Sequence, residues 1–140
     1  MNAVLLVGRI LFAFIFITSG IAHFAKLEAM TGYAQYKKLP AAKLGVLASG
    51  LFFLLGGVYI AIGLWVDLGA LLLAITLILA AVIFHNFWKE TDATAKMNEQ
   101  IAFNKDLSLA GAALILFALI ASGTLTDFGP SVGTLNFFNF

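Results

Sequence analysis

The sequence contains no cysteine among its 140 residues, and charged residues make up only 11% of it. The absence of cysteine excludes structural disulfides, thiolate metal sites, cysteine-ligated iron–sulfur clusters and thiol redox centres on this chain. The net charge of +1 excludes the broad basic surface that binding to a nucleic-acid backbone requires. Any redox chemistry would therefore need a bound cofactor, and nucleic acid is not an expected partner.

Hydrophobic residues are abundant instead, at 62% of the sequence. A soluble domain is roughly half apolar and about one quarter charged, so this composition predicts a lipid bilayer as the environment. Four runs have about the length of 20 apolar residues that crosses a hydrocarbon core. These predicted spans are residues 4–24, 44–64, 68–87 and 107–124. None alternates between apolar and polar positions as a barrel strand does, so we predict an all-α, integral membrane four-helix bundle, with residues 1–140 as a single domain.

The first run is predicted to be a span and not a cleaved signal peptide, because it is long, has no charged segment before it and precedes no small-residue cleavage motif. All the lysines lie in the first and third connections between spans. Short cytoplasmic loops are enriched in lysine and arginine, so both connections are predicted to be cytoplasmic, with both termini outside. The third connection, residues 88–106, is expected to be polar and to hold a short surface helix. The tail after the fourth span is expected to lie at the membrane interface.

Small and polar residues recur at helical spacing along each predicted span. The first span aligns Arg9, Gly20 and His23, and the third begins at Asp67 and ends near His85. Small residues let helices approach closely in lipid, so these stripes are predicted to face one another. A charge inside a span is usually paired, so we predict an ion pair between Arg9 and Asp67.

A second polar layer is predicted at the cytoplasmic end of the bundle. His23, His85 and Asn104 are expected at one depth on inward faces, with Lys26 beside them. Neutral imidazole donates or accepts hydrogen bonds and exchanges protons near neutral pH, which suits a quinone-type ring. With Arg9 as a further polar group, these residues form the candidate ligand site. A haem or a metal ranks below a quinone, because neither a full ligand set nor paired axial positions can be found. A purely structural pair of histidines remains an equal alternative.

No nucleophile elbow, phosphate loop, dinucleotide fingerprint or zinc-protease motif is present. Four segments are nevertheless distinctive in their order and spacing. They are Arg9 with "GIAHFAK" at residues 20–26, "GG" at 56–57 with Gly63, "FNKDLSLAGAALIL" at 103–116, and the tail "FGPSVGTL". In these features the chain resembles the DoxX family of small four-helix bacterial membrane proteins along nearly its whole length.

The resemblance implies a bacterial cytoplasmic membrane and an association with respiratory or detoxifying redox systems. Such systems include a quinone-linked thiosulfate oxidoreductase and a membrane complex that holds a superoxide dismutase and a sulfurtransferase. The positions that match the family's recurring ones are Arg9, Gly20, Lys26, Gly56, Gly57, Asn104 and Lys105, and none brings a catalytic role with it. Asn136 stands where an acidic residue is common in the family, so no role of an acidic residue at this position can be transferred to this chain.

The leading hypothesis is a redox-associated membrane subunit that offers a quinone-type site and receives electrons from partner proteins. The first alternative is a non-catalytic scaffold that holds partners through its cytoplasmic connections, with Lys37, Lys38 and Lys96 as crosslinking positions. A small-solute carrier ranks last, because the spans offer few polar groups between the Arg9 layer and the histidine layer. Small-residue stripes are equally compatible with a homo-oligomer and with a subunit of a larger membrane complex.

Overall fold

The computed structural model describes residues 1–140 and contains helices without strands. The helices are α1 (Asn2–Ala25), α2 (Leu27–Tyr36), α3 (Ala42–Ile62), α4 (Val66–Phe84) and α5 (Ala93–Ala121), with a 3-10 turn η1 (Phe87–Lys89) before α5. Four of them, α1, α3, α4 and α5, are long and apolar enough to cross a membrane. The predicted all-α helical bundle is therefore confirmed.

The helices differ from the predicted spans mainly at the start of α5. This helix begins at Ala93, where the side chain of Asp92 accepts a hydrogen bond from the backbone N–H of Ala95 at 2.8 Å. Lysine and glutamate propagate a helix well, so the charged residues after the cap extend the helix and do not interrupt it. The expected separate surface helix in residues 88–106 is wrong, because most of this segment is the first half of α5. A short helix does occur in the first connection, as α2.

The long helices form two neighbouring pairs, α1 with α3 and α4 with α5, and α3 joins the pairs by packing against α4. Glycines permit the closest approaches. A Cβ on Gly20 would lie 2.8 Å from the carbonyl oxygen of Gly50, and one on Gly56 would lie 2.9 Å from that of Gly69. Atoms do not approach so closely without a shift, so the backbones touch only because these side chains are absent. The predicted role of small residues in helix contacts is thus confirmed at these positions.

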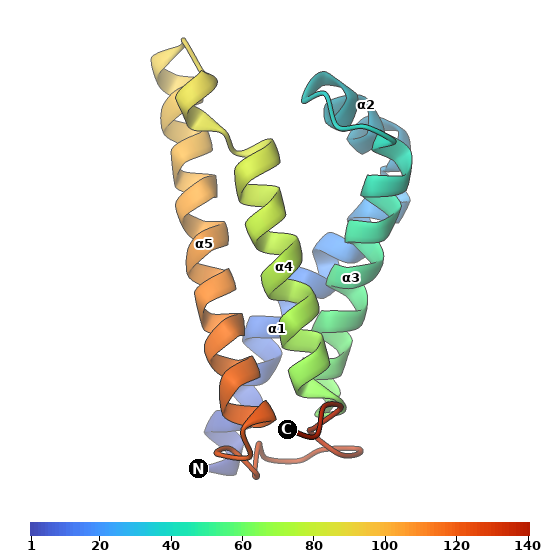
Figure 1. Cartoon of the computed structure of the whole chain (residues 1–140), viewed down its shortest axis with the longest axis vertical. Coiled ribbons are helices and arrows are strands. Elements are labelled where there is room, and N and C mark those ends of the chain that lie inside the picture. Colours follow the sequence, from blue (N-terminus) through green and yellow to red (C-terminus); the bar gives the residue numbers. More distant parts are fainter.

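The bundle has two unlike ends (Figure 1). Both termini lie at one end, together with the turn between α3 and α4; we call it the tail end, comprising residues 1–9, 63–67 and 122–140. The other end carries α2, η1 and the start of α5, and we call it the polar end, comprising residues 26–41 and 85–106. The two helix pairs diverge towards the polar end, where α2 and the start of α5 stand apart in the view.

At the tail end, Arg9 and Asp67 do not pair with each other as predicted. Arg9 donates from Nη1 to the carbonyl oxygen of Phe128 at 2.8 Å and from Nη2 to that of Pro130. Asp67 accepts from the backbone N–H groups of Phe137 and Phe138 at 2.7 and 2.9 Å. The expectation of an ion pair is wrong because the tail folds back under the bundle and brings backbone groups to both buried charges.

Candidate functional site

A cavity of about 520 Å³ lies between the two helix pairs, in the half of the bundle nearer the polar end. All five α-helices contribute to its wall, and most of the lining side chains are hydrophobic, among them Phe16, Phe53 and Leu77. Its polar groups include His23 from α1 and His85 from the end of α4. Drug-sized ligands occupy cavities of roughly 300–1,000 Å³ with mostly apolar walls and a few polar groups, and this cavity has that character.

His23 presents one nitrogen for a ligand. Its Nδ1 lies 2.7 Å from the carbonyl oxygen of Ser19, one turn earlier in α1. A carbonyl oxygen only accepts, so Nδ1 carries the proton and Nε2 of the neutral ring is left as an acceptor. The ring packs edge-on against Phe53, with the ring centres 5.5 Å apart, and Gly50 leaves room for its Cβ. His23 is therefore held in one orientation with Nε2 free to accept a hydrogen bond.

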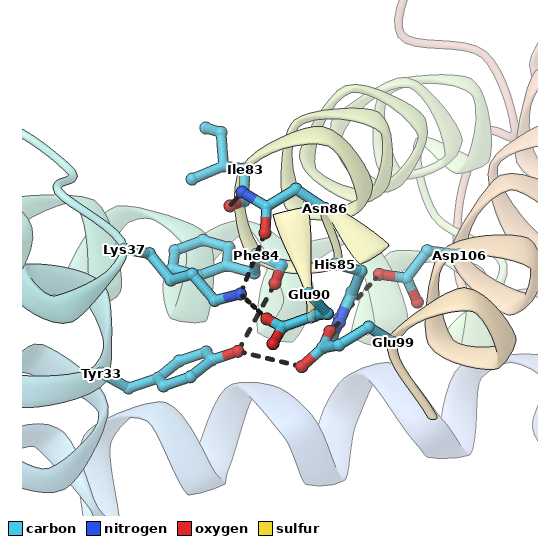
Figure 2. Close-up of polar contacts among 9 residues, drawn as sticks. All are labelled: Tyr33, Lys37, Ile83, Phe84, His85, Asn86, Glu90, Glu99 and Asp106. Carbon is cyan, nitrogen blue, oxygen red and sulfur yellow. Dashed lines mark hydrogen bonds and ion pairs between the residues drawn. The ribbon is translucent and has the colours of Figure 1, made fainter. Parts of the chain in front are cut away.

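His85 lies between two carboxylates (Figure 2). Its Nδ1 is 2.8 Å from Glu99 Oε2, and its Nε2 is 3.5 Å from Asp106 Oδ2. His85 follows the last residue of α4, and both carboxylates come from one face of α5, seven positions apart. Asp106 is buried and lines the cavity together with His85. The imidazole thus lies between a carboxylate at the cavity wall, Asp106, and one outside the cavity, Glu99.

Two residues from the region of α2 complete this network. The Tyr33 hydroxyl lies 3.4 Å from Glu99 Oε1 and 3.4 Å from the carbonyl oxygen of Phe84. Lys37 donates to Asn86 Oδ1 at 3.0 Å and pairs with Glu90 at 3.6 Å. Burial raises the pKa of Tyr33 to about 12, and the negative charge of Glu99 and its hydrogen bond to the phenol add to the rise. We call this set the polar network: Tyr33, Lys37, His85, Asn86, Glu90, Glu99 and Asp106 (Figure 2).

The chain matches a known protein family. The DoxX family model matches residues 4–86. The chain belongs to the DoxX family. With its four long apolar helices, this DoxX chain is a multi-pass membrane protein. No curated protein and no solved structure matches it significantly.

The family match includes both histidines of the DoxX chain but ends at residue 86, before η1 and α5. Glu99 and Asp106, the two partners of His85, therefore lie outside the matched segment. The cavity of this chain combines a wall from the matched helices with the carboxylate of Asp106 from α5.

The structure brings only some of the predicted site residues together. His23 and His85 both line the cavity. Asn104 is exposed and absent from the cavity wall, so its predicted inward position is wrong. Lys26 is exposed at the junction of α1 and α2, and Arg9 lies at the tail end, bonded to the tail backbone. Asn104 does not face inward because of the rotational phase of the long α5. That phase turns Glu99 and Asp106 towards His85 and leaves Asn104 on another face of the helix.

Sequence reasoning did not single out Glu99, Asp106 or Lys37 as partners of the site, and did not consider Tyr33. The sequence does contain a pattern that indicates Glu99 and Asp106, because a spacing of seven places both carboxylates on one face of a helix. This pattern can be recognised only if the helix is predicted to begin before Glu99. The chain has no cluster of three or more histidine or acidic side chains arranged to hold a metal ion. Both nitrogens of His85 face carboxylates, so this ring offers no free nitrogen to a haem iron.

Proposed function

We propose that this DoxX protein binds a quinone-type ring in the cavity between its helix pairs and acts as a membrane subunit of a redox system. The observation that carries the proposal is a mostly apolar cavity whose polar groups include His23 and the His85–Asp106 pair. A quinone ring is flat and apolar with oxygens at opposite edges. Its edges need hydrogen-bonding groups, and its faces need aromatic and aliphatic contacts of the kind that Phe16 and Phe53 supply.

Access from the bilayer supports a lipid-soluble ligand over a water-soluble one. Several cavity-lining side chains are also exposed on the outer surface of the helices, among them Phe52, Ile75 and Leu79. In a membrane this surface faces lipid, so a hydrophobic molecule would enter sideways between the helices. The chain holds no cysteine, and we propose that a partner protein supplies the electrons.

The proposal includes an orientation. The polar end carries the lysines of both long connections, which favours the cytoplasmic side of a bacterial inner membrane for α2 and η1. Because the chain lacks cysteine, single-cysteine variants at exposed positions provide a clean test. Thr91→Cys is expected to react with a membrane-impermeant maleimide only after the cells are opened, and Thr126→Cys is expected to react in intact cells. The reverse pattern would place the polar end outside.

The ligand is tested by equilibrium binding of a short-chain benzoquinone analogue to the protein in nanodiscs. Ala80 lines the cavity, so Ala80→Trp is expected to fill it and weaken binding at least about tenfold, or about 1.4 kcal/mol. Ala112 is exposed on α5 and does not line the cavity, so Ala112→Trp is the matched control and is expected to bind as the parent does. Equal affinities of the two variants, or no binding by the parent, would overturn the proposal and favour the scaffold hypothesis.

A further inference from the structure

Three side chains lead from the solvent of the polar end to the cavity. Glu99 is partly exposed, with 23% of its side chain accessible, and does not line the cavity. Glu99 is hydrogen-bonded to His85 at 2.8 Å, and Asp106 lies at ion-pair distance from the other ring nitrogen, 3.5 Å away. His85 and Asp106 both line the cavity, so the series begins near solvent and ends at the cavity wall.

Hydrogen-bonding rules limit the protonation states of this series. An ionised carboxylate only accepts, so a ring nitrogen that faces a carboxylate stabilises it only when that nitrogen carries a proton. A doubly protonated ring satisfies both, whereas a neutral ring serves only one and leaves its other nitrogen as an acceptor. With Nδ1 donating to Glu99, the neutral ring matches Asp106 only if that carboxyl carries the proton. One proton can therefore be held by the ring or by Asp106, and its loss leaves two acceptors facing each other.

We infer that Glu99, His85 and Asp106 form a proton relay that takes up one proton from the polar end when a ligand carbonyl oxygen binds in the cavity. The inference rests on the proposed function, because a quinone carbonyl is the acceptor in question. The carbonyl oxygen needs a donor at the cavity wall, and a protonated His85–Asp106 pair supplies one. No bond of the ligand changes in this step: Glu99 passes a solvent proton to Nδ1 of a ring that holds its own proton on Nε2. The doubly protonated ring then donates from Nδ1 to Glu99, and its Nε2–H, beside the Asp106 carboxylate, donates to the ligand oxygen.

The other ionisable groups around the relay make its members the natural site of uptake. Tyr33 also lines the cavity, but its hydroxyl is directed to Glu99 or to the Phe84 carbonyl. Lys37 is already bonded to Asn86 and Glu90. His23 faces the cavity from α1 with an acceptor nitrogen, and α3 contributes no charged side chain to the wall. Lys105 also lines the cavity and is the competing donor, so it has to be tested separately.

The test measures the dissociation constant of the benzoquinone analogue between pH 5.5 and 9 for the full-length protein in nanodiscs. If one proton is taken up, the constant rises about tenfold per pH unit on the alkaline side of the transition. Asp106→Asn and His85→Gln are expected to remove the dependence, and Glu99→Gln to move the transition to lower pH because the protonated ring loses a partner. Lys105→Met is expected to keep the tenfold slope, and the exposed Glu28→Gln is expected to keep the parent's whole profile.

The outcomes separate the relay from the proposed function. Tight binding by the parent with no pH dependence, or a dependence lost in Lys105→Met alone, overturns the relay and leaves the quinone-type site standing. Absence of binding overturns the site, and the relay is then decided by nitrogen NMR of the ring. The chain has two histidines, so His23→Gln isolates the signals of His85. Their pH response is expected to change in Asp106→Asn and in Glu99→Gln; an unchanged response in both overturns the relay without any ligand.

Discussion

The two ends of the bundle use charged residues in opposite ways. At the tail end, Arg9 and Asp67 are buried, with 4% and 0% exposure, and both side chains are hydrogen-bonded to backbone groups, those of the tail and, for Asp67, also the N–H of Leu68. At the polar end, the charged side chains contact one another beside a cavity. Backbone carbonyls and N–H groups do not titrate, so the tail end holds one fixed arrangement. A network of carboxylates, imidazole and phenol can change its protonation, so the polar end can respond to a ligand.

The largest expected effect comes from removing the charge that holds the end of the tail. Asp67→Ala leaves the partly buried N–H groups of Phe137 and Phe138 without their acceptor and is expected to destabilise the protein by about 3 kcal/mol, since an unpaired donor costs about 1–3 kcal/mol when fully buried and less when partly buried. Reversible unfolding in mixed detergent micelles measures this. The control is Asp127→Ala, an exposed residue with a local bond to Gly129, for which about 0.5 kcal/mol or less is expected. Equal losses would show that the tail end is not fastened by Asp67.

Arg9→Met should loosen the other part of the tail with a smaller loss of stability, about 2 kcal/mol, since carbonyl oxygens tolerate an unpaired state better than N–H groups do. Hydrogen exchange locates the effect. The N–H of Val132, bonded to the Ile62 carbonyl at 3.0 Å, is expected to exchange faster, whereas the N–H of Lys89, bonded to Asn86 at 2.9 Å, should keep its rate. Faster exchange at both ends would contradict the independence of the two regions.

At the polar end, Lys37→Met is expected to cost about 1 kcal/mol or less but to change the geometry. Lys37 ties the end of α2 to Asn86 and Glu90, which belong to the other helix pair's side of the cavity. Spin labels on Gln35→Cys and Thr91→Cys, placed in a chain without native cysteine, should report a longer or broader distance in Lys37→Met. Lys38→Met is the control, because Lys38 is exposed and forms no ion pair. An unchanged distance distribution would mean that the cavity walls do not depend on this tie.

The structure of each end could be predicted from the sequence only to the extent that its contacts leave a pattern in the sequence. The helices could be predicted, because long apolar runs have few other structures in a membrane. His23 and His85 could be placed at one cavity, because helical period and depth are both readable from position. The partners of Arg9 and Asp67 could not be predicted, because they are backbone groups of a folded-back tail, and backbone groups leave no pattern in the sequence. Glu99 and Asp106 were missed for a different reason: charged residues suggested a loop, whereas Asp92 caps a helix that carries them to His85.

The smallest expected effect concerns Tyr33, which reports on the electrostatics of the polar end. Its pKa of about 12 is raised first by burial and then by Glu99. A raised pKa favours the neutral phenol in the folded protein, so this contribution to stability is complete below about pH 10, the ordinary pKa of tyrosine, and is lost as the pH rises to about 12. Glu99→Gln should lower the pKa by a fraction of a pH unit and still leave it above about 10, because burial remains the larger cause.

The ultraviolet absorbance of the phenolate measures this change in a Tyr36→Phe, Tyr59→Phe background, which leaves Tyr33 as the one tyrosine of three. Glu28→Gln is the matched control, since Glu28 is exposed on α2 and outside the polar network. An unchanged pKa in Glu99→Gln would separate Tyr33 from the carboxylate and shorten the network to its His85 part. A drop to about 10, the ordinary value, would instead mean that charge and not burial dominates at the polar end. In that case the contrast with the tail end, where backbone groups hold the charges in place, would be sharper still.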